Sequence, residues 1–423
     1  MNTKKLTLSI VVLFVVADAL HYVSGTGLSD TYLTPISSLS KYLALFIIIY
    51  ITSKSKLKEG IPRSIVNIYR LLMMWNIFTI IYGVFTVRSY WDWKVLFLSS
   101  SLFLLVPLAF FLGKNVMLFR QTFFFFIKYV CYYGFLLIPI GFVTNEELYA
   151  RIVIPISFFI VCIPYLKYKH KLLVLVVAST SVLSILDFRA NIIKISVSFL
   201  ALGTFYLRVV SSKIVYRCAH AFMFLLPIVL LLMAAFGGFN IFEQLQKNEG
   251  YTIKTKISET SNLTADTRTF LYVEVFQTMN ENGTWLFGGG AVAKYKSIYF
   301  TELVTGNMRY GTEVGFLNTL LNSGLIGILF YFLILLVSSY YAIYKSNNNL
   351  CKMMGLLIAS RWILFFLEEL TQFDLNLYFL WLIIGVVSTN KFRSFTDNDL
   401  NSFFKFGPLF TKPKTTSLPV SSK

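Results

Sequence analysis

Several polar residues stand where a mostly apolar chain could bind an anion and activate a hydroxyl group. Arg189 and Asn191 lie in a short polar stretch between two apolar runs, and Arg268 precedes a segment of helical periodicity. Arg309 and Glu313 come just before the longest apolar run. A guanidinium group holds phosphate through paired hydrogen bonds, and a carboxylate can accept a proton from a hydroxyl group. These residues therefore predict a site for an anionic substrate whose reaction needs a base.

Each of these residues also has a structural explanation. Arg189 could pair with Asp187 or reach lipid headgroups with its long side chain. Glu313 could be an exposed acid favoured by the dipole of the helix that follows it. Arg361 lies inside an apolar run, where a charge indicates a substrate site or a structural pair with Glu368.

Two further motifs could complete such a site. The glycines of Leu286-Phe-Gly288-Gly-Gly290 allow a tight turn or a close approach of the backbone to a ligand. The segment after Asp266, a plausible N-cap, predicts a helix with Arg268 in its first turn, where free N–H groups favour an anion. Four residues give this helix one apolar stripe: Tyr272, Val275, Phe276 and Met279. A second helical face is expected to carry Glu313, Leu317, Leu320 and Gly324.

The elements that position these residues are expected to be transmembrane helices. Of 423 residues, 56% are hydrophobic and 14% are charged, whereas a soluble domain carries about 25% charged residues. We predict an all-α polytopic membrane protein with about twelve spans. The predicted spans are 6–20, 35–51, 65–87, 95–112, 122–143, 152–166, 172–186, 192–208, 219–240, 314–344, 352–370 and 375–389. The polar stretch Thr371, Gln372 and Asp374 divides the last two spans.

The distribution of Lys and Arg predicts the orientation. Alternate connections and the C-terminal tail carry 22 of these residues, and the opposite short connections carry 4. By the positive-inside rule both termini are cytoplasmic. The predicted organisation is nine spans in 1–240, a partly helical periplasmic loop in 241–313, three spans in 314–390 and a mostly disordered cytoplasmic tail in 391–423.

The large loop carries no excess of positive charge, since acids and bases are seven each through residue 312. The net charge of +18 is thus mostly a topology signal, and nucleic acid is not an expected partner. A polar loop of this length in a compact protein is usually functional. Of the four cysteines none falls in the loop, so neither a disulfide framework nor a zinc site is predicted. The apolar start could pass for a signal peptide, but we expect a retained span.

The order of these motifs resembles the superfamily of O-antigen polymerases (Wzy-type) and O-antigen ligases, which are bacterial lipid-linked glycan transferases. The similarity covers about residues 180–335. It consists of an Arg at the outer end of a mid-chain helix (Arg189), an Arg-led helix in a large periplasmic loop (Arg268), a Leu-Phe-Gly-x-Gly-like turn, and a polar residue followed by Leu, Leu, Gly and Gly (Glu313 to Gly327). Ligases usually carry His where this chain has Glu313, which favours a polymerase.

The resemblance implies a glycosyltransferase in the bacterial inner membrane that works at the periplasmic face. It would transfer a growing glycan from undecaprenyl diphosphate to a lipid-linked repeat unit. Glu313 is then the expected base, and Arg189 and Arg268 hold the departing diphosphate. Arg309, Asn191, Gly288, Gly290 and Arg361 are expected to bind substrate. The expected partners are the lipid-linked oligosaccharide, membrane lipids and a chain-length regulator, with no cofactor and no metal. A ligase, another envelope-glycan polymerase, and a flippase or other transporter of lipid-linked oligosaccharides are the alternatives.

Overall fold

The computed structural model describes most of the chain. The described residues are 3–24, 30–54, 60–143, 147–184, 189–208, 212–235, 252–253, 261–262, 269–297, 308–367 and 372–405. The structure is about 84% helical, and the β-structure described consists of two short antiparallel ladders. Seven helices of the described chain are long and apolar enough to cross a membrane. The chain is therefore a helical membrane protein.

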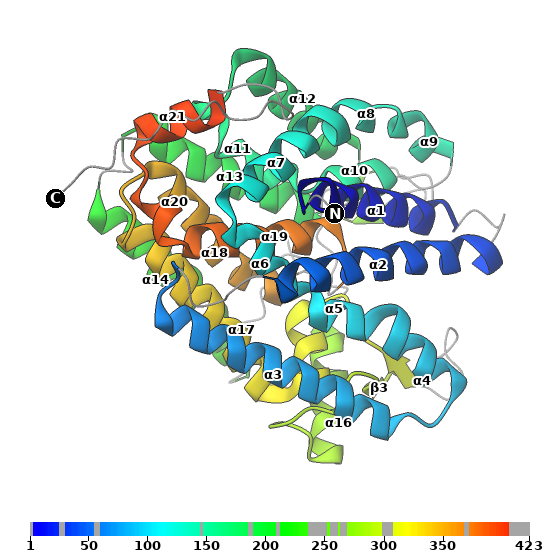
Figure 1. Ribbon diagram of the computed structural model, residues 1–423. Coiled ribbons are helices and arrows are strands. Elements are labelled where there is room, and N and C mark those ends of the chain that lie inside the picture. Colours follow the sequence, from blue (N-terminus) through cyan, green and yellow to red (C-terminus); the bar gives the residue numbers. More distant parts are fainter. Residues whose placement is uncertain are drawn as a thin grey trace.

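The helical elements up to α6 include four of these candidate spans. The bounds are α1 (Thr3–Ser24), α2 (Asp30–Ser53), α3 (Arg63–Thr86), α4 (Tyr90–Val95), η1 (Leu96–Ser100), α5 (Ser101–Leu105) and η2 (Val106–Ala109). The fourth candidate span runs over Tyr90–Lys114 and so joins α4 to α6 (Phe110–Lys114) through a π-helical and a 3-10 turn. Helices α1 and α2 pack side by side as a hairpin (Figure 1).

Most helices in the middle of the chain are short. The elements of this region are α7 (Val116–Phe125), η3 (Phe126–Cys131), α8 (Tyr132–Gly134), α9 (Leu137–Val143), α10 (Glu147–Val153), α11 (Ile156–Ile160), η4 (Ile163–Tyr165), α12 (Tyr168–Ser184), α13 (Arg189–Tyr206) and α14 (Lys213–Ala235). Of these, α14 contains a candidate span, Ile214–Met233. Prolines mark the interruptions, because Pro155 caps α11 and Pro164 is the second residue of η4.

The remaining elements include two of the candidate spans. They are β1 (Thr252–Ile253), β2 (Ser261–Asn262), α16 (Thr269–Asn282), β3 (Lys294–Lys296), β4 (Met308–Tyr310), α17 (Gly315–Tyr344), α18 (Asn349–Leu367), α19 (Leu375–Ser388), α20 (Asn390–Ser394) and α21 (Asp397–Lys405). Helix α17 spans thirty residues, close to the predicted span 314–344. The polar break before α19 is confirmed at Asp374, whose side chain accepts a hydrogen bond from the N–H of Leu377 at 2.8 Å.

Five of the twelve predicted spans have no counterpart among the seven candidates. Span 122–143 is interrupted by the π-helical segment η3, and span 152–166 is divided among α10, α11 and η4. Helices α12, α13 and α19 have 17, 18 and 14 residues. The count of twelve therefore stays a prediction.

The core of the structure is centred on α19. Every residue of this helix is buried, and it is in contact with α6, α7, α17 and α18 (Figure 1). Part of the predicted tail is helical, since α20 and α21 cover Asn390–Ser394 and Asp397–Lys405. Their apolar residues Phe392, Leu400 and Phe404 are buried, and Tyr165 donates a hydrogen bond to Asp397 at 2.7 Å.

Candidate functional site

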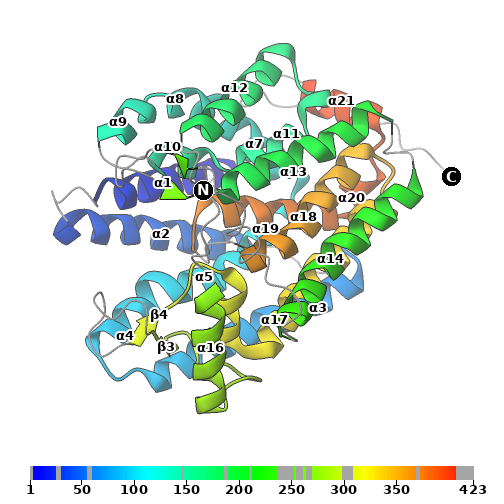
Figure 2. The ribbon, with the colours of Figure 1, turned by 180° about the vertical axis from the view of Figure 1, so that it is seen from behind.

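Residues 269–297 and 308–314, called the loop module below, fold against the N-terminal half of α17. Helix α16 packs on α17 and on β3, and the β3–β4 hairpin lies between α16 and α4 (Figure 2). The predicted helix is present as α16, with Val275 and Met279 fully buried and Tyr272 and Phe276 partly buried. The predicted N-cap Asp266 and the arginine Arg268 lie outside the described residues.

Helix α16 is attached to the C-terminal end of α18. The hydroxyl group of Tyr272 donates a hydrogen bond to the carbonyl oxygen of Phe366 at 2.7 Å. The ring of Tyr272 stacks on Phe316 near the start of α17, and Phe316 stacks on Phe366 with centroids 4.3 Å apart. The first turn of α16 therefore meets the start of α17 and the end of α18.

The β3–β4 hairpin presents two faces of different chemistry. Its register places Tyr295 opposite Arg309 and Lys294 opposite Tyr310. Because successive side chains of a strand point to opposite faces, Tyr295 and Arg309 share one face and Lys294 and Tyr310 share the other.

The first face forms the Arg309 cluster, defined as Glu274, Tyr295, Ser297, Arg309 and Glu313. Arg309 Nη2 lies 3.8 Å from Glu313 Oε1, and the Glu313 side chain is half exposed. Ser297 donates a hydrogen bond to the buried carboxylate of Glu274 at 3.3 Å. Burial raises the pKa of Tyr295 to about 12, although the Arg309 guanidinium opposes the shift. The cluster thus places a cation and an accessible carboxylate together, above a neutral phenol.

The second face is anchored to the short helix α4. Lys294 Nζ lies 2.7 Å from the buried carboxylate of Asp92, and Tyr310 donates to the same carboxylate at 2.5 Å. The backbone N–H groups of Arg88 and Ser89 occupy its other oxygen at 2.8 Å each. Burial disfavours the charge of Lys294, but hydrogen bonds with Asp92 and Tyr310 raise the pKa of Lys294 above its ordinary value. Asp92 thereby fixes the strand pair that carries Arg309.

Glycines Gly288 and Gly290 form a turn that fills a break in α17. At Gly324 the backbone of α17 takes φ 65° and ψ −171°, which interrupts the helix. The N–H groups of Gly289 and Gly290 donate to the carbonyl oxygens of Leu321 and Asn322 at 2.8 and 3.0 Å. The N–H of Leu325 donates in return to the carbonyl oxygen of Trp285 at 2.8 Å. The turn thus supplies hydrogen bonds that the interrupted helix lacks.

This contact leaves no room for a side chain at the turn. Gly288 and Gly290 have φ values of +74° and +86°, a region that glycine adopts without strain. A Cβ atom on Gly288 would lie 2.4 Å from the carbonyl oxygen of Asn322, and one on Gly290 would lie 2.9 Å from the backbone N of Gly83. In the described structure these glycines approach α17 and α3, so the structural explanation of the motif applies to them.

The predicted face from Glu313 to Gly324 is correct only in its middle. Leu317 and Leu320 are fully buried. Glu313 precedes α17, which begins at Gly315 after the extended residue Val314, and Gly324 stands at the break. Glu313 therefore projects from the chain that leads into α17, close to Arg309, and does not lie on the helix itself.

The residues predicted on α13 and α18 occupy different surroundings. Asn191 is fully buried, and its amide group donates to the carbonyl oxygen and the hydroxyl of Ser181 at 3.1 and 2.9 Å, which joins α13 to α12. Arg361 is 3% exposed, and its guanidinium lies 4.4 Å from the ring centroid of Phe158. Arg189 is the first residue of α13. Its expected partner Asp187 and the expected partner Glu368 of Arg361 lie outside the described residues.

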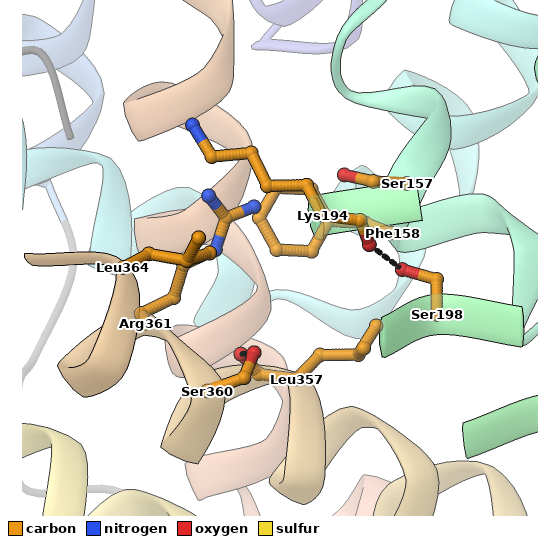
Figure 3. Close-up of a pocket in the computed structure, with 8 residues that line it drawn as sticks. All are labelled: Ser157, Phe158, Lys194, Ser198, Leu357, Ser360, Arg361 and Leu364. Atoms are coloured by element: carbon orange, nitrogen blue, oxygen red, sulfur yellow. Dashed lines mark hydrogen bonds between the residues drawn. The ribbon is translucent and has the colours of Figure 1, made fainter. Parts of the chain in front are cut away.

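Arg361 borders a small cavity between α11, α13 and α18 (Figure 3). Lys194 of α13 lies beside Arg361, and Ser198, one turn further along α13, lies toward Leu357. The cavity volume is about 10 Å³, room for about one water molecule. The order of these residues along the cavity, Lys194 near Arg361 and Ser198 toward Leu357, shows that α13 and α18 run antiparallel (Figure 3).

The antiparallel packing of α13 and α18 brings the starts of α13, α16 and α17, which follow or carry the predicted site residues, toward one end of the structure. Because α13 and α18 are antiparallel, Arg189 begins its helix at the level where α18 ends near Phe366. Phe366 in turn contacts Tyr272 and Phe316. Phe316 follows Glu313 by three residues, and α16 starts at the residue after Arg268. The starts of α16 and α17 therefore meet at the end of α18, and α13 begins toward the same end of the structure.

Sequence reasoning did not single out Asp92, Lys294, Tyr295 or Glu274 as site residues. Asp92 forms a capping box with Ser89 at the start of α4, a pattern that is readable in the sequence as Ser-x-x-Asp. The ion pair between Asp92 and Lys294 joins residues that are far apart in the chain, so no local sequence pattern predicts it. Glu274 lies on α16 one position before the buried Val275, and it is not part of the apolar stripe predicted from the sequence.

No protein-family model, no curated protein and no solved structure matched this chain. Among the residues that the structure describes, no three His, Cys, Asp or Glu side chains are grouped so that they could hold a metal ion. The expectation of a site without metal stays a prediction.

Proposed function

We propose that this protein is a surface-polysaccharide polymerase of the O-antigen type in a bacterial inner membrane, with its termini cytoplasmic and its large loop periplasmic. It would transfer a growing glycan from undecaprenyl diphosphate to a lipid-linked repeat unit. The observation that carries the proposal is the Arg309–Glu313 pair, held by a folded module at the start of a broken transmembrane helix. The type of reaction is inferred from the order of the motifs in the sequence, which resembles that of O-antigen polymerases.

The proposed reaction forms one glycosidic bond and breaks one sugar–phosphate bond. A hydroxyl oxygen of the acceptor sugar attacks the anomeric carbon of the donor, and the bond from that carbon to the diphosphate breaks with its electron pair on the diphosphate. Glu313 accepts the hydroxyl proton, which its half-exposed side chain can do at a membrane surface. Arg309 stabilises the negative charge that develops on the leaving diphosphate.

Arg189 and Arg268 are the other two arginines expected to bind the diphosphate. Arg189 begins α13 and Arg268 directly precedes α16. Helix α16 contacts the end of α18 through Tyr272 and Phe366, and α13 packs on α18. A lipid diphosphate carries enough charge for several guanidinium groups, and its lipid chain would remain among the helices. This arrangement supports a site at the boundary between the loop module and the bilayer.

The test uses a strain that lacks its own polymerase and reads the glycan ladder on a gel. Glu313→Gln and Arg309→Ala are each expected to reduce chain extension by about 10²-fold or more, the usual effect of losing a base or a charge-stabilising group. Glu281→Gln and Lys296→Met, which change exposed charges of the same module, are matched controls. Full ladders from inserted Glu313→Gln, Arg309→Ala, Arg189→Ala and Arg268→Ala proteins would show that the site is wrong.

A flippase for lipid-linked oligosaccharides is the second candidate, favoured by ionisable groups buried between helices. Lys41 and Asp18 lie 3.8 Å apart with side chains 13% and 7% exposed, and Lys194 and Arg361 border the small cavity. Charges within membrane helices often mark a transport path. Purified protein in vesicles that moves lipid-linked units across the bilayer without lengthening them would favour this second function.

A further inference from the structure

The glycine turn, residues 284–290, runs along α3 from the middle of that helix toward its C-terminal end. The ring of Phe287 lies 5.9 Å from the ring of Trp75, and Trp75 is at the middle of the 24-residue α3. Four residues later, the N–H of Ala291 donates to the carbonyl oxygen of Thr79 at 3.2 Å. Gly290 packs against Gly83, closer to the C-terminal end of the helix. Phe287 is therefore the deepest of these contacts.

On its other side the turn contacts α17 at Asn322 and Gly324, where the helix is broken. At 1.5 Å per residue the 24-residue α3 is about 36 Å long, and the hydrocarbon core of a bilayer is about 30 Å thick. A transmembrane α3 therefore places Trp75, and with it the tip of the turn, near the middle of the bilayer.

The side chains at the tip suit that depth. Leu286 and Phe287 are 57% and 52% exposed. The exposed neighbours on the two helices, Met74 and Phe78 of α3 and Leu325 and Leu329 of α17, are also apolar. A turn in water would expose this patch at a considerable cost in free energy, whereas hydrocarbon chains cover it without such a cost.

We propose that residues 284–290 form a re-entrant turn, inserted into the hydrocarbon region, whose Leu286 and Phe287 contact the acyl chains of bilayer lipids. Non-helical backbone at membrane depth requires partners for its polar groups. The break in α17 provides them, since it accepts from Gly289 and Gly290 and donates to Trp285. The loop predicted to lie outside the membrane thus enters it at this point. This inference does not depend on the proposed enzymatic function.

The experiment measures the depth of a fluorescent label on the turn. The parent is Cys218→Ser, because the other three cysteines are buried. Phe287→Cys is labelled with bimane and reconstituted into vesicles of phosphatidylcholine brominated near the ends of its acyl chains. Met74→Cys, on the lipid-facing side of α3 at the same level, is the reference for depth. Glu281→Cys, at the polar end of α16, is the reference for exposure to water.

The bimane at position 287 is expected to lose as much fluorescence to the brominated lipid as the bimane at position 74. Iodide in the aqueous phase should quench the label at position 281 more strongly than either. Quenching of position 287 by iodide to the same extent as position 281 would overturn the proposal. Protection of position 287 from both quenchers would also overturn it, because protein would then cover the turn. If Phe287→Cys does not fold, Leu286→Cys gives the same test.

Discussion

Replacing Gly288 by alanine tests whether the glycine turn fills the break in α17. Gly283, only five residues earlier, offers a matched control, because it also has a positive φ, +65° against +74°. No heavy atom lies within 4 Å of a Cβ atom placed on Gly283, whereas one on Gly288 would lie 2.4 Å from the carbonyl oxygen of Asn322. The two substitutions therefore share the backbone strain and differ in the contact with α17.

The expected difference follows from the hydrogen bonds that must break. A side chain in the left-handed region costs about 1–2 kcal/mol, and this term cancels between Gly283→Ala and Gly288→Ala. To relieve the clash, the turn must move away and release the bonds from Gly289 and Gly290 to α17. Each buried polar group left without a partner costs about 1–3 kcal/mol. Gly288→Ala should therefore lower the free energy of unfolding by about 2–6 kcal/mol more than Gly283→Ala.

The measurement is unfolding of the purified proteins in mixed micelles with increasing sodium dodecyl sulfate. Gly324→Ala provides a second variant from the opposite side of the contact, since its Cβ atom would lie 2.2 Å from the carbonyl oxygen of Leu286. Both Gly288→Ala and Gly324→Ala should be less stable than Gly283→Ala. Equal stability of Gly283→Ala and Gly288→Ala would refute the placement of the turn in the helix break.

Three further predictions concern the attachments of the loop module and of the tail. Asp92→Asn should lower the free energy of unfolding by about 3–5 kcal/mol, because it removes one partner of a buried pair. Adding Lys294→Met to Asp92→Asn should restore part of the lost free energy of unfolding. If the effects of the two substitutions simply add in the same unfolding assay, Asp92 and Lys294 do not interact as a pair. Tyr272→Phe should cost about 0.5–1.5 kcal/mol by removing one hydrogen bond and should speed proteolysis of α16; unchanged proteolysis would contradict the attachment to α18. Hydrogen bonds from the backbone N–H and the hydroxyl of Thr396 lower the pKa of Asp399 below its ordinary value of 3.8. The contribution of Asp399 to the stability of α21 should therefore be present above pH 4 and disappear as the pH falls through the lowered pKa. Labelling of a cysteine introduced at Phe404 should rise at that low pH, and Asp399→Asn should remove the rise; a rise of the same size in Asp399→Asn would exclude this carboxylate as its cause.

Local patterns in the sequence predicted the class of the protein and several of its elements. The long apolar run became α17, the periodic segment became α16, and Asp374 caps the start of α19. These features depend on residues within one or two turns of each other, so hydrophobicity, helical period and capping chemistry are sufficient to predict them.

The number of spans was harder to predict, because an apolar run does not reveal how the backbone within it is interrupted. Span 122–143 reads as continuous hydrophobic sequence, but its backbone changes to a π-helix at Phe126–Cys131. Helix α19 has only fourteen residues although its whole surface is buried and apolar in character. Neighbouring helices decide where such segments begin and end.

The sequence by itself determined that this is a helical membrane protein and that a polar loop with Arg309 and Glu313 leads into its longest helix. The tertiary structure decided how that loop is held. The carboxylate of Asp92 meets Tyr310, 218 residues away, and the glycine turn meets the break at Gly324. Both contacts join segments that are distant in the chain, and their partners are selected by three-dimensional packing and by the need to satisfy buried polar groups. No local pattern carries that information.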